Sequence, residues 1–87
     1  MSENLVIYAR NVREFYPALS WLRKCVEKRI NKGEAVDINY LARCSTMTSL
    51  VSSVAKYGAK FGETYTKEDK RQACMELAEY IIEDTKI

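Results

Sequence analysis

The chain contains no histidine, one proline and three glycines among its 87 residues. The lack of histidine removes the commonest general base and the commonest metal ligand of proteins. So few prolines and glycines argue against a β-sandwich or barrel, which needs many tight turns. No stretch approaches the roughly 20 apolar residues that span a membrane, and the apolar run at residues 5–8 is too short for a secretion signal. These absences predict a helical protein of the cytoplasm.

Cysteine is also scarce, because Cys25, Cys44 and Cys74 form an odd-numbered set without a Cys-x-x-Cys pair. Such a set does not make a disulfide framework, and three thiolates without histidine fall short of a structural zinc site. Free cysteine is among the most buried residue types, so we expect all three to be small members of the core. The sequence accordingly predicts a reducing compartment, no metal and no cofactor.

The residue inventory also argues against an enzyme. The length allows a single domain over residues 1–87, which buries roughly 64% of the surface of the unfolded chain. No nucleophile–base pair and no phosphate-binding loop can be assembled from the residues present. Glu76, Glu79 and Glu83 share one helical face, which makes them a solvated row rather than a convergent pair of catalytic carboxylates. We therefore expect a non-enzymatic protein.

Apolar residues recur at helical spacing in four stretches of the sequence. These stretches are 11–32, 37–44, 48–60 and 67–84. Residues 1–10 precede them as an extended arm, within which residues 5–8 could instead form a short strand beside residues 35–38. The sequence thus predicts an all-α fold, a small bundle of three to four helices with an extended N-terminal arm.

Capping residues and helix breakers set the expected helix ends. Pro17 suits the first turn of a helix that begins near Tyr16, although a kinked start capped by Asn11 is the alternative. Gly33 is expected to end that helix, because glycine readily adopts the left-handed conformation found there. Thr66 with Asp69 approximates a capping box at the start of the last helix.

The predicted core consists of the apolar stripes of three helices. Its members are Leu19, Leu22, Val26 and Ile30, then Met47, Leu50, Val51 and Val54, then Cys74, Leu77, Ala78, Ile81 and Ile82. Tyr57 and Phe61 lie four residues apart and continue the middle stripe, so we expect them to pack in the core. Interleaved with lysines, they alternatively suit stacking on single-stranded nucleic acid.

The second and third predicted helices resemble the helix-turn-helix class of DNA-binding proteins over about 22 residues. Asp37 caps a short helix, the hydroxyl-rich residues 45–48 favour a turn and a new helix start, and a second helix follows with serines and lysines outside. The resemblance implies that this helix-turn-helix-like central pair lays its second helix in the major groove, with hydroxyls and amides on phosphate.

The charge distribution favours the same partner. Residues 38–62 contain no acidic residue, and residues 10–60 hold ten basic and four acidic side chains, whereas residues 61–87 hold four basic and seven acidic ones. A basic body of this kind attracts a polyanion. We predict a small regulatory or accessory protein that binds duplex DNA. The expected contacts are Arg43, Thr46, Thr48, Ser49, Ser52, Ser53, Lys56 and Lys60.

A second prediction concerns the aromatic residues of the first helix. Trp21 lies at the edge of the apolar stripe, where a tryptophan either closes the core or lies at an interface with a partner. The alternative function is therefore a protein-interaction module that forms a homodimer or modulates a partner protein. Its surface would consist of Tyr16, Trp21 and the arm residues Leu5 and Ile7.

Overall fold

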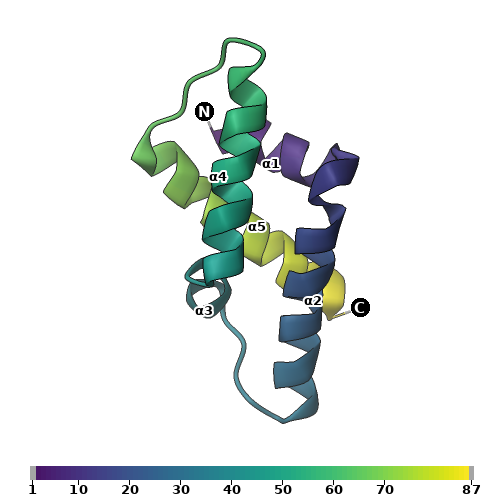
Figure 1. The fold of residues 1–87 in the computed structure, drawn as a ribbon. Helices are drawn as coiled ribbons and strands as arrows, with labels where there is room; N and C mark the ends of the chain where they lie inside the picture. The colour runs from purple at the N-terminus through teal and green to yellow at the C-terminus, as the bar shows by residue number, and fades with distance from the viewer. Residues whose placement is uncertain (1, 87) are drawn as a thin grey trace.

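The computed structural model describes residues 2–86. Of these residues 80% are helical and none lies in a strand. Its elements are α1 (Ser2–Asn11), the short 3-10 helix η1 (Arg13–Phe15), α2 (Tyr16–Asn31), α3 (Ile38–Ala42), α4 (Ser45–Ala59) and α5 (Lys67–Thr85). In Figure 1, α2 and α4 stand side by side, α1 runs from behind α4 to the top of α2, and α5 crosses behind both. The all-α class is confirmed. No helix of residues 2–86 is long and apolar enough to cross a membrane.

The N-terminal segment is a helix, so the predicted extended arm over residues 1–10 is wrong where the structure describes it. Leu5 and Ala9 are four residues apart and both fully buried, which gives α1 a narrow apolar stripe toward the core. Glu3 in the first turn and Arg10 in the last turn both suit the helix dipole. The apolar run at residues 5–8 thus has helical rather than strand periodicity once Ala9 is counted with it. Within the described part of the chain, the bundle has five α-helices instead of three or four.

The helix predicted over residues 11–32 begins later, at Tyr16, with Pro17 in its first turn as expected. Asn11 is the last residue of α1 and not a cap of α2, because its Nδ2 donates to the Ile7 carbonyl at 2.9 Å. Gly33 has φ +73° and follows the end of α2, which confirms its expected role. Ile30 is exposed rather than buried, since the last turn of α2 extends past the core.

The middle of the chain forms α3 and α4, joined by only two residues. Asp37 caps α3 as expected, because its Oδ1 accepts from the Tyr40 amide at 2.7 Å. The predicted turn at residues 45–48 is wrong, since α4 already begins at Ser45 after the extended residue Cys44. Its hydroxyls do not cap the helix; Thr48 Oγ1 instead donates back to the Cys44 carbonyl at 3.3 Å. The helix expected over residues 48–60 is therefore one turn longer at its start.

The last helix, α5, begins at a capping box and packs on the other helices. Thr66 Oγ1 accepts from the Asp69 amide at 3.0 Å, and Asp69 Oδ2 accepts from the Thr66 amide at 2.9 Å, which completes the expected capping box. The buried face of α5 packs on α1, α2, α3 and α4. Its buried members are Ala73, Leu77, Ala78, Ile81 and Ile82.

The side chains at the end of α4 do not all enter the core. Tyr57 is half-buried, and its ring meets those of Tyr8 and Phe15 edge-on at centroid distances of 5.2 and 5.9 Å. Phe61 is 61% exposed, so its predicted place in the core is wrong. It lies beyond the last turn of α4 and covers the Tyr57 ring from the solvent side, with 5.3 Å between the two ring centroids.

Candidate nucleic-acid interface

The outward face of α4 carries hydroxyls and Lys56 because its large aliphatic residues lie on the inward face. Met47, Leu50, Val51 and Val54 are buried, and helical spacing places the serines on the opposite side. A shallow hollow follows this outward face. Its lining is Ser45, Thr48, Ser49, Ser52, Ser53 and Lys56.

The structure brings five of the eight predicted contact residues together in this hollow: Thr48, Ser49, Ser52, Ser53 and Lys56. Arg43, exposed between α3 and α4, lines a neighbouring pocket that also includes Thr48 and Ser52. Thr46 is half-buried and lines neither space. Lys60 follows the end of α4, where its Nζ lies 5.7 Å from the centre of the Tyr57 ring.

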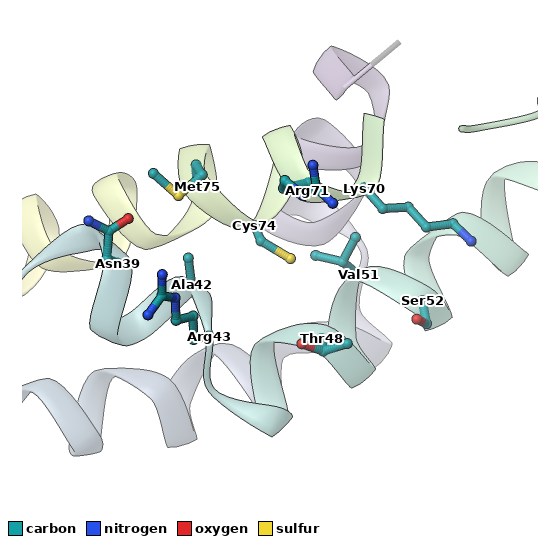
Figure 2. A pocket seen from close by; sticks show the side chains of 10 residues that line it. All are labelled: Asn39, Ala42, Arg43, Thr48, Val51, Ser52, Lys70, Arg71, Cys74 and Met75. Atoms are coloured by element: carbon teal, nitrogen blue, oxygen red, sulfur yellow. The ribbon is translucent and has the colours of Figure 1, made fainter. Parts of the chain in front are cut away.

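The neighbouring pocket lies between α3, α4 and α5 and has a volume of about 550 Å³. Figure 2 shows the side chains of α5 above those of α3 and α4, with the Cys74 thiol pointing into the space between them. The complete lining is Asn39, Ala42, Arg43, Thr48, Val51, Ser52, Lys70, Arg71, Cys74 and Met75. This pocket adds two cations, Lys70 and Arg71, to the predicted set.

Sequence reasoning missed Lys70 and Arg71 because they belong to the segment of net negative charge at residues 61–87. Helical phase gives the missing signal for Lys70 only. Lys70 lies in the first turns of α5, about half a turn around the helix from Glu79, so counting along the helical stripes separates it from the acidic row. Arg71 lies only about 80° around the helix from Glu79 and is not separated in this way.

The charge of this region is positive and weakly compensated. Among the described residues, no carboxylate lines the hollow or the pocket. Arg71 Nη1 lies 3.2 Å from Glu68 Oε2, and both side chains are well exposed, so the pair is weak. Within residues 2–86, the structure records no ion pair for Arg43, Lys56 or Lys70. A polyanion that approaches this side of the molecule therefore meets Arg43, Lys56 and Lys70, for which residues 2–86 supply no ion-paired carboxylate.

Glu63 brings a carboxylate close to this surface, at the far end of α4. It lines a groove with Lys56 and Lys70, but its oxygens already accept hydrogen bonds from Asn4 Nδ2, at 2.7 Å, and from the Tyr65 hydroxyl. The bond from Tyr65 holds the pKa of the Glu63 carboxyl below its ordinary value, against the opposing effect of partial burial. The charge of Glu63 is thus held toward α1 and its own loop.

Cys74 forms a neutral part of the pocket wall. It is half-buried, and this burial raises the pKa of its thiol, so the group stays protonated at neutral pH. Cys25 and Cys44 are half-buried as well, which corrects the expectation that all three cysteines lie in the core. The Cys44 thiol donates to the Tyr40 carbonyl at 3.6 Å.

The residues predicted for a protein interface differ in their exposure to solvent. Leu5 is fully buried in the core, so its predicted place at an interface is wrong. Ile7, Tyr16 and Trp21 are exposed, and Trp21 keeps 56% of its surface in solvent. Tyr16 lines a small pocket with Arg10 and Tyr80, whereas Trp21 lies more than one turn further along α2.

The acidic residues of α5 do not converge. Glu79 and Glu83 are exposed, Glu76 is half-buried, and all three point from one helix. Among residues 2–86, no three His, Cys, Asp or Glu side chains come together as a metal site requires.

Comparison of the chain with protein families, with curated proteins and with solved structures gave no match. The function is therefore inferred from the geometry and charge of this surface.

Proposed function

We propose that this protein is a non-enzymatic nucleic-acid-binding protein that contacts the phosphates of duplex DNA. The observation that carries the proposal is the outward face of α4, where hydroxyls and Lys56 line a hollow to which the described residues contribute no carboxylate. Arg43, Lys70 and Arg71 extend the positive surface beside it. Cations and small hydroxyl donors are the groups that neutralise and hydrogen-bond a phosphate backbone.

The relation of α3 to α4 supports a helix-turn-helix-like role. α3 spans five residues, only Arg43 and Cys44 separate it from α4, and Figure 1 shows it end-on beside the first turn of α4. Helix-turn-helix pairs cross at a steep angle of about 90–120° and present the second helix to the major groove. No side chain of residues 2–86 caps the start of α4, so a phosphate there would meet unsatisfied backbone amides.

The composition of this face predicts weak sequence preference. Arginine, asparagine and glutamine make the bidentate contacts that distinguish bases, and the exposed face of α4 carries none of them. Serine hydroxyls donate to any base or phosphate. The proposed role is therefore that of a small regulatory or accessory protein that binds DNA largely through its backbone.

The test is the salt dependence of binding to a random duplex, followed by fluorescence anisotropy. Replacing Lys56 and Lys60 with Gln should weaken binding alike for all sequences. It should also reduce the slope of log affinity against log salt by about 1 for each phosphate that a lysine no longer neutralises. Lys24→Gln on the outer face of α2 is the matched control, because it removes the same charge and should leave the slope unchanged.

Two results would overturn the proposal. One is an affinity for duplex DNA no better than about 100 μM at low salt, the weak end of ordinary non-specific binding. The other is an equal weakening by Lys24→Gln and by the α4 variants, because binding would then depend on total charge and not on this face.

The exposure of Trp21 favours a second candidate function, a protein-interaction module. A tryptophan that keeps 56% of its surface in solvent on the outer side of a helix is typical of interface anchors. In this case, sedimentation should reveal a homodimer or a captured partner, and Trp21→Ala should abolish the association while leaving the salt slope of DNA binding unchanged. Ile30→Ala, at another exposed apolar residue of α2, is the control.

A further inference from the structure

The pocket between α3, α4 and α5 has the size and wall chemistry of a small-molecule site. Its volume of about 550 Å³ lies within the range of ligand pockets, which is roughly 300–1,000 Å³. Such sites combine apolar walls with a few polar groups that orient the ligand. The shallow hollow on α4 lacks the apolar part, since serines, a threonine and a lysine line it.

The middle of the pocket is apolar. Val51 contributes its side chain from α4, Cys74 and Met75 contribute sulfur-bearing side chains from α5, and Ala42 lies on α3. Burial keeps the Cys74 thiol neutral, and a methionine thioether makes favourable contacts with aromatic rings. This part of the pocket suits a flat ring better than a charged or strongly hydrated group.

The two ends of the pocket differ in their polar groups. Figure 2 shows Lys70 and Ser52 at one end, and Asn39 and Arg43 at the other. An ammonium with a hydroxyl beside it provides donors for an anion. Arg71 also lines the pocket, although its guanidinium is paired with Glu68 at 3.2 Å. An amide and a guanidinium can instead hydrogen-bond the edge of a heterocycle and stack on its face.

We infer that this pocket binds an aromatic phosphate monoester of the size of a mononucleotide. The phosphate lies at the Lys70 and Ser52 end, and the ring edge faces Asn39. The ring lies against the wall that Cys74 forms with the nearly buried Val51. A phosphate monoester carries about 1.5 to 2 negative charges at pH 7. The described residues line this pocket with several cations and no carboxylate side chain. A doubly charged phosphate ligand therefore matches the pocket better than a ligand with a singly charged carboxylate does.

This site is proposed independently of DNA binding, although it overlaps the proposed DNA interface. The shared residues are the hydroxyls of Thr48 and Ser52 and the cations Arg43, Lys70 and Arg71. A ligand in the pocket would occupy hydroxyls that a DNA phosphate also uses. If both functions hold, the ligand and the duplex compete, and the ligand acts as a regulator of DNA binding.

The experiment uses the whole chain and three probes that divide the ligand into parts: AMP, adenosine and inorganic phosphate. Binding is measured by calorimetry, and amide chemical shifts locate the site. We expect AMP to bind at least tenfold more tightly than either part alone. The shifts should map to Asn39, Val51 and Cys74 rather than to the outward serines of α4.

Lys70→Gln distinguishes this site from general charge attraction. It should weaken AMP binding about tenfold, the worth of one charge-assisted hydrogen bond, and leave adenosine binding unchanged. Lys60→Gln removes the same charge outside the pocket and should leave both unchanged. Circular dichroism of each variant verifies that it folds.

Three outcomes would overturn the inference. They are no AMP binding at millimolar concentration, equal weakening by Lys60→Gln and Lys70→Gln, and chemical shifts that map to the outward face of α4. AMP binding without duplex binding supports the pocket and contradicts the DNA proposal. Duplex binding without AMP binding supports the DNA proposal and contradicts the pocket, so each proposal can fail without the other.

Discussion

Glu63 is the residue at which three parts of the chain meet. Its carboxylate accepts from Asn4 of α1 and from Tyr65 of its own loop. Tyr65 in turn lies against the last turn of α4 at Gly58, where a Cβ atom would come within 2.6 Å of the tyrosine hydroxyl oxygen. A glycine is needed there because the tyrosine occupies the space of a side chain. The Glu63 carboxylate thus connects α1 to the loop before α5, and Tyr65 of that loop packs on the end of α4.

The acidity of Glu63 gives a prediction for stability against pH. Folding lowers the pKa of Glu63 from its ordinary value of 4.5, so its contribution to stability is complete above that pH and is lost as the pH falls through the lower, folded-state pKa. The melting temperature of the native chain should therefore fall more steeply below pH 4.5 than that of Glu63→Gln. Glu83→Gln, at an exposed position of α5, should follow the native chain. Parallel curves for the native chain and Glu63→Gln would refute the role of this carboxylate.

The capping box of α5 gives a second prediction at the scale of one residue. Thr66→Ala removes the hydroxyl that accepts from the Asp69 amide, and the free energy of unfolding should fall by about 1 kcal/mol. Thr64→Ala is the matched control, since Thr64 is exposed in the same loop and should change stability by less than about 0.5 kcal/mol. Urea denaturation measures both. Equal effects would mean that the cap adds nothing to α5.

Among the elements, α1 differs most from its prediction and gives the sharpest test. Leu5 is fully buried and Ile7 is more than half exposed, although both belong to the same apolar run. Leu5→Ala should cost about 2–5 kcal/mol of unfolding free energy because it leaves a cavity, whereas Ile7→Ala should cost less than about 0.5 kcal/mol. Chemical denaturation of both variants measures the difference. Similar small effects would indicate that residues 2–11 lie on the surface as an arm.

Local signals were sufficient to predict helix ends at capping residues and at a glycine. Asp37, Thr66 and Gly33 each form the bond or conformation that their chemistry indicates. The signals failed where tertiary packing decides. α1 has only Leu5 and Ala9 to mark its buried face, and α4 extends through three hydroxyl-bearing residues because Met47 is needed in the core.

In the candidate site, too, residues on one helix could be predicted from the sequence, whereas residues brought in by tertiary packing could not. The serines and Lys56 were found from the spacing along one helix. Lys70 and Arg71 reach the site only because α5 packs across α3 and α4, a contact between distant parts of the sequence. For Trp21, helical phase alone left both the edge of the core and an interface open, because it does not say where the core ends; the exposure of 56% excludes a place in the core.

At the scale of the whole molecule, the fold depends on elements from both ends of the chain. α1 packs on α4 and α5, and its buried residues belong to the single core. A chain that lacks residues 2–11 should therefore lose its cooperative thermal transition instead of forming a trimmed bundle. It should keep helical far-ultraviolet dichroism, lose near-ultraviolet dichroism and bind a hydrophobic dye. A sharp melting transition in the shortened chain would show that α1 is an appendage, with the full chain as the control.

The packing of α1 against α5 also bears on how the protein is made. Ribosomes deliver the chain from its N-terminus at about 5–20 residues per second, so Leu5 emerges several seconds before Leu77 and Ile81. Until both α4 and α5 have been synthesised, the apolar side of the first helix lacks part of its native packing surface, and an isolated helix of ten residues is marginal in water. The native packing of α1 is thus complete only after α5 has been synthesised, and until then the apolar side of residues 2–11 stays partly exposed.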